Sequence, residues 1–397
     1  MTRNLIILCS GDSEYREYIL REIAKKYRIF LLSPDRVTWE SPYISDHDII
    51  DPSNSCDVIA KALEISRRTV VTGVLTYHEP CVELVAVISQ KLNLPHCGLR
   101  GASLCRDKYA ARIALRAAGL PSVQCTLVHN HAEARSAARE IGYPVVVKPR
   151  ALSASFGVTL VNDDSEIDAA YDCAQESTLP EPWDHRRGVL VEDYLPGLEI
   201  SVDSIVQGEE VDPVIFARKM LGFSPNFEEV GHIVARPAEV VDDPDEVRAV
   251  VRAAHKAYEI SNTATHTELR MTPGGPQVVE INGRSGGGLI PYLGQLATGF
   301  NLAVASADVA VGTQPDLLQT EHCVAGIRFF YATADERQAL SNLCFRRSRP
   351  YWLHRVASFG DTNASLTPGR LYFSRIGYGI VTAETVESCM NRLAAMA

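Results

Sequence analysis

The sequence has no cysteine pattern that would build a zinc site or a redox centre. Its ten cysteines are scattered between Cys9 and Cys389, and none forms a C-x-x-C pair or a Cys/His cluster with zinc spacing. We therefore expect free, buried thiols in a reducing compartment.

The chain also lacks a long apolar run and a surplus of basic residues. No stretch approaches the length of a membrane span, and the apolar run 5–9 is too short for a signal peptide. The net charge of −10 argues against nucleic acid or an anionic membrane as the main partner. We expect a cytoplasmic protein that binds small molecules, with no nucleic-acid and no membrane partner.

The N-terminal part alternates strand-like and helix-like segments but has no dinucleotide fingerprint. Segments 4–9, 28–32 and 70–76 read as buried strands separated by helical segments, which is typical of a parallel sheet with helices on its faces. The first strand is followed by Ser10-Gly11-Asp12, which is not G-x-G-x-x-G. A nucleotide is therefore expected elsewhere in the chain.

The segment 266–284 carries the most informative pattern. Its Pro-Gly-Gly-Pro turn is flanked by two alternating runs, which predicts a hairpin. Folding the hairpin about Gly274 sets Glu268 opposite Glu280, and Asn282 shares a face with Glu280. Like charges that face each other destabilise a strand pair, so a cation is expected there. Carboxylate and amide oxygens suit Mg²⁺, although a solvated hairpin face that is acidic by chance is the alternative.

Two lysines look placed to bind an anion. Lys148 ends the apolar strand 144–148, where an unpaired buried charge would be costly. Lys108 opens a helix that begins at the cap Asp107, where a cation fits the helix dipole poorly. Taken singly, each lysine could equally be a surface residue.

Two further segments could contact a nucleotide, although each is a weak signal alone. The loop 151–157 offers backbone N–H groups and the hydroxyls of Ser153 and Ser155, but only one glycine, Gly157. The segment 191–199 is a strand followed by a tight turn, whose backbone could bind a purine edge; an acidic turn is the alternative. Arg284, at the end of the hairpin segment, precedes a glycine run and could donate bidentate hydrogen bonds to a phosphate or a carboxylate.

In this order, the segments resemble the ATP-grasp superfamily of carboxylate–amine ligases. The resemblance spans roughly residues 70–290. Its matching motifs are Arg106-Asp107-Lys108, Tyr143-Pro-Val-Val-Val-Lys148, the loop 153–157, Val191-Glu-Asp-Tyr-Leu-Pro-Gly-Leu-Glu199, and His266-Thr-Glu268 with Glu280-Ile-Asn282-Gly-Arg284. Within the superfamily the chain is most similar to the L-amino-acid ligases, the dipeptide-forming group related to bacilysin synthetase and carnosine synthase. The motifs Val74-Leu-Thr-Tyr-His-Glu79 and Phe227-Glu-Glu-Val-Gly-His232 fit that group.

The resemblance implies a role for each motif. It places ATP phosphates on Lys108 and Lys148 under a lid formed by Ser153, Ser155 and Gly157, and the nucleoside on Glu192, Asp193, Leu195 and Glu199. It places two Mg²⁺ ions, with Mn²⁺ as an alternative, on Glu268, Glu280 and Asn282. The implied catalytic and substrate-binding set is Arg284, Arg328, Glu79 and His232; for Arg328, Glu79 and His232 a structural role is the alternative.

The implied fold is α/β of the ATP-grasp type. We expect an N-terminal parallel α/β domain over 1–105, a central lid subdomain over 106–190, a catalytic subdomain over 191–312, and a small C-terminal α+β extension over 313–397. The implied reaction is ATP-dependent amide formation between amino-acid-like substrates through an acyl phosphate. Bicarbonate activation and a non-catalytic nucleotide-binding module are alternatives, and a homodimer is a family-level expectation.

Overall fold

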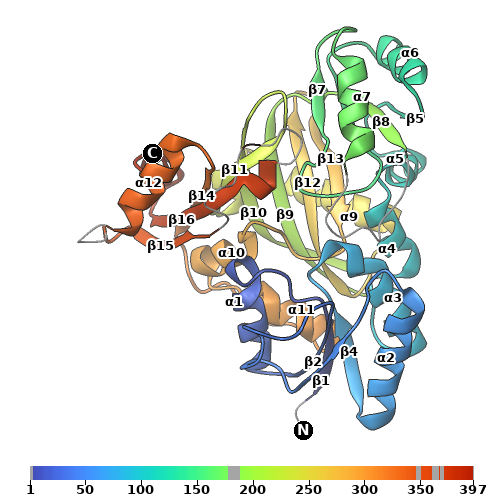
Figure 1. Cartoon of the computed structure of the whole chain (residues 1–397), viewed down its shortest axis with the longest axis vertical. Coiled ribbons are helices and arrows are strands. Elements are labelled where there is room, and N and C mark those ends of the chain that lie inside the picture. The colour runs from blue at the N-terminus through green and yellow to red at the C-terminus, as the bar shows by residue number, and fades with distance from the viewer. Residues whose placement is uncertain (1–2, 178–187, 346–349, 360–365, 367–370, 397) are drawn as a thin grey trace.

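The structure is a computed structural model of the chain that describes residues 3–177, 188–345, 350–359, 366 and 371–396. It contains three sheets, arranged as Figure 1 shows. Among the described residues, no helix is long and apolar enough to cross a membrane. The cysteines are free thiols, but Cys56 and Cys344 are exposed, so burial is not general.

The first sheet is parallel, as the sequence predicted, with strand order β3-β2-β1-β4. Its strands are β1 (Asn4–Leu8), β2 (Arg28–Ser33), β3 (Asp46–Ile49) and β4 (Val71–Leu75). The accompanying helices are α1 (Ser13–Ala24), α2 (Ser55–Arg68), η1 (Glu79–Cys81), α3 (Val82–Lys91) and α4 (Leu99–Arg106). The polar edge strand β3 was not predicted, because its sequence Asp-His-Asp-Ile has no apolar alternation.

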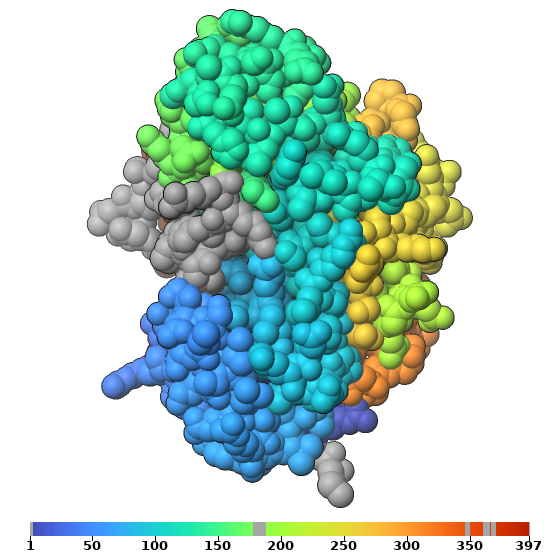
Figure 2. All heavy atoms as spheres, turned by 90° about the vertical axis from the view of Figure 1, so that its right-hand side faces the viewer, coloured from blue at the N-terminus to red at the C-terminus, as the bar shows by residue number. Residues whose placement is uncertain are grey.

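The second sheet has the order β5-β8-β6-β7 and is antiparallel. Its strands are β5 (Cys125–Val128), β6 (Val145–Pro149), β7 (Thr159–Val161) and β8 (Val189–Asp193), and its helices are α6 (His131–Ile141) and α7 (Ile167–Glu176). The helix α5 (Lys108–Ala117) precedes it and begins where predicted, since the Asp107 side chain accepts from the N–H groups of Tyr109 and Ala110. Figure 2 shows this unit above the N-terminal unit.

The third sheet is antiparallel and has eight strands in the order β13-β12-β9-β10-β11-β14-β16-β15. These strands are β9 (Leu198–Gln207), β10 (Glu210–Gly222), β11 (Glu228–Ala235), β12 (Thr263–Thr272), β13 (Gly275–Asn282), β14 (Val324–Tyr331), β15 (Leu353–Ser358) and β16 (Arg375–Ala383). Its helices are α8 (Pro237–Val240), α9 (Pro244–Tyr258), α10 (Ile290–Thr298), α11 (Leu302–Ala310), α12 (Ala334–Cys344), η2 (Leu371–Ser374) and α13 (Val386–Ala394). The strands after residue 312 thus continue the sheet that carries the predicted hairpin.

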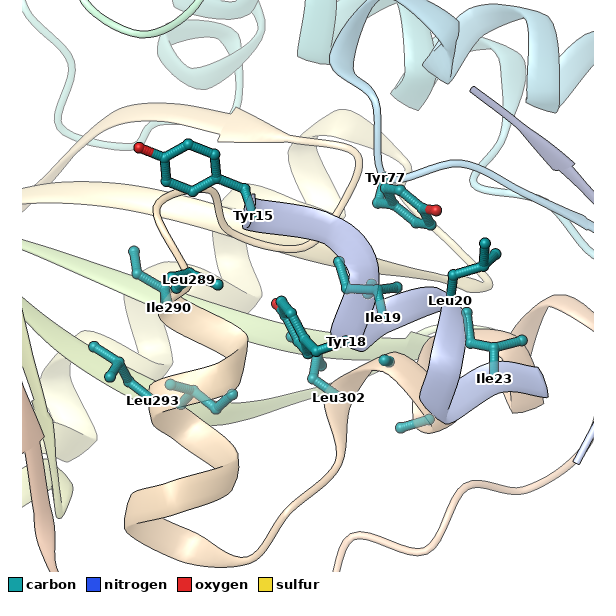
Figure 3. Packing of buried hydrophobic residues seen from close by; sticks show 14 of the residues in the cluster. Tyr15, Tyr18, Ile19, Leu20, Ile23, Tyr77, Leu289, Ile290, Leu293 and Leu302 are labelled. Atoms are coloured by element: carbon teal, nitrogen blue, oxygen red, sulfur yellow. The ribbon is translucent and has the colours of Figure 1, made fainter. Parts of the chain in front are cut away.

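A shared core joins the first sheet to the third. The helix α11 packs against α1 and β4 on one side and against β9 and β12 on the other. Figure 3 shows the side chain of Tyr18 on α1 beside Leu302, and Ile19 and Leu293 belong to the same buried cluster. Gly73 in β4 permits this approach, because a Cβ there would lie 2.6 Å from the Ala310 carbonyl oxygen. The core therefore holds α1 against the large sheet.

Candidate active site

The hairpin of β12 and β13 sets Glu268 directly opposite Glu280, as the sequence predicted. Its turn pairs Thr272 with Gly275, so a regular ladder would set Glu268 opposite Val279 instead. A bulge between the pairs of Glu268 and the following residue takes up one extra residue. The opposed carboxylates therefore depend on the bulge and not on the turn alone.

The same bulge keeps the two faces of β13 distinct. Val278 and Ile281 are three residues apart, yet both lie in the hydrophobic core beneath the sheet. Val279, Glu280 and Asn282 line a cavity on the other face. The strand thus presents its polar side chains to the cavity without burying them in the core.

Each opposed carboxylate is held by its own lysine. Glu268 lies 2.7 Å from Lys219 Nζ, and Glu280 lies 2.9 Å from Lys108 Nζ. Asn282 Nδ2 donates to Glu280 Oε1 at 3.1 Å. Burial would raise the pKa of Glu280, but the charge of Lys108 outweighs it and the pKa is lowered. The predicted repulsion between the two carboxylates is thus reduced by the ammonium groups of Lys108 and Lys219.

The oxygen atoms of Glu268, Glu280 and Asn282 fit a hard divalent cation. In the part of the chain that the structure describes, no three His, Cys, Asp or Glu side chains converge into a metal site. Two carboxylates and one amide are a donor set that leaves coordination positions for water and phosphate oxygens, as Mg²⁺ prefers. The set suits an ion that arrives with a phosphate ligand.

His266 connects the hairpin to β9. Its Nδ1 lies 2.6 Å from Asp203 Oδ1, and its Nε2 lies 3.3 Å from Glu268 Oε1. Burial would lower the pKa of His266, but the charges of Asp203 and Glu268 outweigh it and raise the pKa to about 9. His266 is therefore an imidazolium near neutral pH and adds positive charge beside Glu268.

Lys219 is the common partner of several carboxylates. Besides Glu268, it lies 3.2 Å from Glu199 and 3.9 Å from Glu229. Glu199 also lies 3.0 Å from Arg270 Nε. Burial would raise the pKa of Glu229, but Lys219 and neighbouring charges hold it at about 2. The Lys219 ammonium group therefore neutralises much of the acidic wall of the cavity.

Glu192 forms buried ion pairs with both Lys148 and Arg112. Lys148 Nζ lies 2.5 Å from Glu192 Oε2, and Arg112 Nε lies 2.9 Å from Glu192 Oε1. Burial would raise the pKa of Glu192, but Arg112 and Lys148 hold it at about 2. Burial lowers the pKa of Lys148. The structure thus brings these two predicted nucleotide-binding residues into direct contact.

The segment 191–199, which we call the hinge, and the loop 151–157 border the same cavity. Asp193 and Leu195 line it, as do Ser153 and Ser155, whereas Gly157 does not. The Asp193 carboxylate accepts from the backbone N–H of residue 124 at 3.0 Å. Gly157 packs against residues 174 and 177 on the far side of the loop. The predicted lid therefore contributes serines but not its glycine.

Non-glycine residues supply the unusual backbone of this loop. Leu152, Ala154 and Ser155 have φ values of 76°, 56° and 55°. These left-handed conformations cost energy in non-glycine residues and persist where the surroundings fix them. The Leu152 carbonyl accepts from Lys108 at 2.6 Å, and Ser155 Oγ donates to the Phe227 carbonyl at 2.9 Å. Contacts to two other segments thus hold the loop.

Arg284 and Glu79 lie together at the end of the cavity near the N-terminal unit. Glu79 Oε2 lies 2.6 Å from Arg284 Nε, and Glu79 Oε1 lies 2.9 Å from Arg106 Nη1. Arg284 Nη1 also donates to the Ser285 carbonyl at 2.7 Å. Glu79 thus fixes the Arg284 guanidinium on the cavity wall, which is a positioning role.

Besides Gly157, two further predicted residues do not line the cavity. His232 is fully buried beneath it and contacts the lining residue Glu229 at 2.6 Å. Arg328 lies on β14 and pairs with Glu336 at 2.7 Å, over the Phe330 ring. The structure does not bring Arg328 to the cavity, because its partner lies on α12. Arg328 therefore takes no part in the mechanism that we propose.

The other predicted residues meet in one cavity of about 380 Å³ between the three sheets. Sequence reasoning did not select several members of its wall: Tyr15, Arg16, Lys219, Glu229, Tyr372 and Arg375. All of these except Glu229, which lies within the motif 227–232, come from segments without a recognised motif. Lys219 was the most accessible to prediction, since a lysine within the apolar strand 214–221 signals a buried counter-ion.

Comparison with known proteins agrees with the motifs. Residues 141–291 match the family model of the ATP-grasp domain. Over 259 residues the chain is 28% identical to the alanine–anticapsin ligase of Bacillus subtilis, a match that covers 60% of this chain and 52% of that protein. The chain thus spans about half the length of this relative. Over 396 residues it is also 28% identical to an uncharacterised protein of Sinorhizobium fredii, covering 98% and 80% of the two chains.

The fold has a close structural counterpart. The crystal structure of an L-amino acid ligase from Bacillus licheniformis aligns with a TM-score of 0.81 at 20% sequence identity, covering 100% of this chain and 97% of that one. At this identity the likeness concerns the fold. The chain therefore contains a segment, residues 141–291, that matches the ATP-grasp domain, and it shares its overall fold with this ligase.

Proposed function

We propose that the chain is an ATP-dependent carboxylate–amine ligase that joins two amino-acid-like substrates through an amide bond. One observation carries the proposal. A single cavity holds two lysines suited to phosphate, Lys108 and Lys148, opposed carboxylates on a bulged hairpin, and an arginine fixed by Glu79. The alanine–anticapsin ligase among the relatives supports the amino-acid substrate class.

ATP would lie along the wall that runs from the hinge to the hairpin. Leu195 and the strand end at Glu192 would contact the base, and Glu199 would accept from the ribose hydroxyls. Lys148 and Lys108 would bind the phosphates. Both ammonium groups now contact carboxylates at 2.5 and 2.9 Å, so they already lie among polar groups that can exchange partners.

Mg²⁺ would bind Glu268, Glu280 and Asn282, where it would neutralise charge on the phosphate oxygens. Lys108 and Lys219 contact the two carboxylates in the structure and would keep them ionised before the nucleotide arrives. His266 adds a further positive charge next to Glu268. This chain therefore keeps the carboxylates in the form that binds a cation.

The proposed reaction has two steps. First, a substrate carboxylate oxygen attacks the γ-phosphorus of ATP, and the bond from that phosphorus to the β–γ bridging oxygen breaks, which releases ADP and leaves an acyl phosphate. Second, the lone pair of a substrate amine attacks the acyl carbon. The bond between that carbon and the phosphate oxygen then breaks, phosphate leaves, and the nitrogen loses a proton to solvent.

The protein contributes mainly positioning and charge stabilisation to these steps. Arg284, held by Glu79 and by the Ser285 carbonyl, would donate to the transferring phosphoryl group. An acyl phosphate hydrolyses if water reaches it, so the site must be covered. The loop 151–157, fastened through Ser155 to the Phe227 carbonyl, would supply the cover.

A screen over pairs of amino acids tests the proposal. With purified protein, Mg²⁺ and ATP, we expect ADP release that requires both members of a pair and matches an amide product seen by mass spectrometry. Glu280→Gln should abolish the release, whereas Glu210→Gln, at the exposed start of β10, should not. ADP release that needs bicarbonate and no amine, or no release with any pair, would contradict the proposal.

A further inference from the structure

Arg16 is a cavity-lining arginine for which the proposed reaction has so far supplied no partner. It lies on α1 and borders the cavity that also contains Arg284. Its side chain is half-buried, and its guanidinium carbon lies 5.7 Å from the centre of the Tyr77 ring. Within the described part of the chain, the Arg16 guanidinium forms no hydrogen bond or ion pair; only its backbone N–H is bonded, to the Asp12 carbonyl.

The other lysines and arginines of the cavity wall differ from Arg16 in this respect. Each contacts a carboxylate at 3.2 Å or less: Lys108 with Glu280, Lys148 and Arg112 with Glu192, Lys219 with Glu268, Arg270 with Glu199, Arg284 with Glu79, and Arg375 with Glu228. Arg16 is thus the cation of the described wall that lacks an internal counter-ion. A guanidinium in this state is suited to an incoming anion.

The neighbours of Arg16 strengthen the demand for an anion. Burial lowers the pKa of the Arg16 guanidinium, and the positive charge of Arg284 lowers it further. Arg16 also lies in the N-terminal half of α1, where the helix dipole disfavours a cation. An anion beside Arg16 would relieve both effects.

The surrounding wall is aromatic and comes from opposite ends of the chain. Tyr15 and Tyr372 line the cavity with their ring centres 6.3 Å apart, and Ile290 adds an aliphatic surface. Figure 3 shows the Tyr15 hydroxyl pointing away from the other labelled side chains of α1. A small organic anion could therefore pair with Arg16 while its carbon atoms pack on these rings.

We propose that Arg16 binds the carboxylate that the amine-bearing substrate keeps throughout the reaction, so that this substrate is an α-amino acid rather than a simple amine. The inference rests on the proposed ligase function and specifies one of its two substrates. Arg16 is then a specificity-determining residue for the acceptor.

The acceptor is favoured over the donor because of where the donor carboxylate must react. The donor carboxylate loses its charge at the γ-phosphate, next to Glu280 and Arg284. Arg16 belongs to a different element, α1, which carries none of the candidate metal ligands. A carboxylate on Arg16 is therefore one that survives the reaction, and in an amino-acid acceptor that is its own α-carboxylate.

The test compares acceptor amino acids with their C-terminal amides, which keep the amine but lack the negative charge. For an active pair from the screen, we expect Arg16→Gln to raise the KM of the acid acceptor at least tenfold and to leave the KM of its amide, and of the donor, unchanged. Arg16→Lys should restore part of the preference for the acid. Arg21→Gln, a change on the exposed side of the same helix, is the matched control.

Folding and binding controls separate the possible failures. Because Arg16→Gln removes a repelled cation, the thermal midpoint of the unliganded variant should not fall. Stabilisation by the twenty standard amino acids, measured with Mg²⁺ and ADP present, should show an acid-over-amide preference that depends on Arg16. Equal losses for acid and amide, or a raised donor KM, would overturn the assignment. Absence of turnover in the unaltered protein would contradict the ligase function instead.

Discussion

Lys219 Nζ lies 2.7 Å from Glu268 Oε1, which makes a strand-borne lysine the internal counter-ion of a candidate metal ligand. The pair links β10 to β12, which are separated by β9 in the sheet. Side chains on the same face of alternate strands can meet in this way only when the sheet is formed. Lys219 therefore couples the folding of the sheet to the charge state of the site.

Lys219→Met should destabilise the protein strongly. The change leaves Glu268, Glu199 and Glu229 without a shared cation, and breaking a buried ion pair by removing one partner costs about 3–5 kcal/mol. Urea titration followed by circular dichroism measures the loss. Lys25→Met is the control, because its surface pair with Glu22 is worth only about 0–1 kcal/mol. Equal stability of the two variants would show that Lys219 is not the counter-ion.

His266 predicts a pH dependence of stability. Its folded pKa, about 9, lies above the ordinary value, so it contributes stability that is complete at pH values below the unfolded pKa and is lost as pH rises through about 9. The difference in the free energy of unfolding between the unaltered protein and the His266→Gln variant should therefore become smaller as the pH rises from neutral to 9. Denaturant titrations at several pH values measure this difference; a difference that is constant with pH would refute the assignment.

Glu280→Ala should abolish ADP release while the protein remains folded. The variant loses a candidate Mg²⁺ ligand, and we expect the rate to fall at least about 100-fold, as for the loss of a group that stabilises transition-state charge. Lys108 keeps its bond to the Leu152 carbonyl, which supports folding. Coupled ADP measurement and circular dichroism check both statements. Full ligation activity would remove Glu280 from the metal site.

Lys148→Ala should mainly weaken nucleotide binding. Its ammonium group is proposed to hold an ATP phosphate, and a loss of about 1.4 kcal/mol or more corresponds to at least about tenfold in affinity. Glu192 keeps its contact with Arg112, so the pocket should stay formed. A calorimetric titration with a non-hydrolysable ATP analogue measures the change, with exposed Lys91→Ala as the control. Unchanged affinity would count against the assignment.

The hairpin shows how far the sequence could lead. Alternation and turn residues predicted that Glu268 faces Glu280, and the structure confirms the pair. A fold about Gly274 alone does not produce this pair, because the strand register at the turn differs by one residue from the register at Glu268 and Glu280. The bulge at Val279 accounts for the extra residue. Bulges depend on which residues the core demands, so local alternation alone does not reveal them.

The residues that were missed depend on contacts between distant segments. Lys219 meets Glu268 only across β9, and Arg16 reaches the cavity only because α11 holds α1 against the large sheet. Arg328, by contrast, was selected from an apolar strand that indeed forms, but its side chain points to α12. The sequence predicted that this segment is a strand. Which of its side chains face the cavity depends on how β14 pairs with β11 and β16.

The eight-stranded sheet makes the end of the chain costly to remove. β14 pairs along β11, so a protein cut after residue 312 would expose a row of unpaired backbone groups on β11. It would also lose Phe329 and Tyr378 from the core shared with α1. We expect such a truncation to aggregate rather than yield a smaller folded protein. The part of the cavity wall that this segment supplies, which includes Tyr372 and Arg375, could then differ between related chains by substitution but not by loss of the segment.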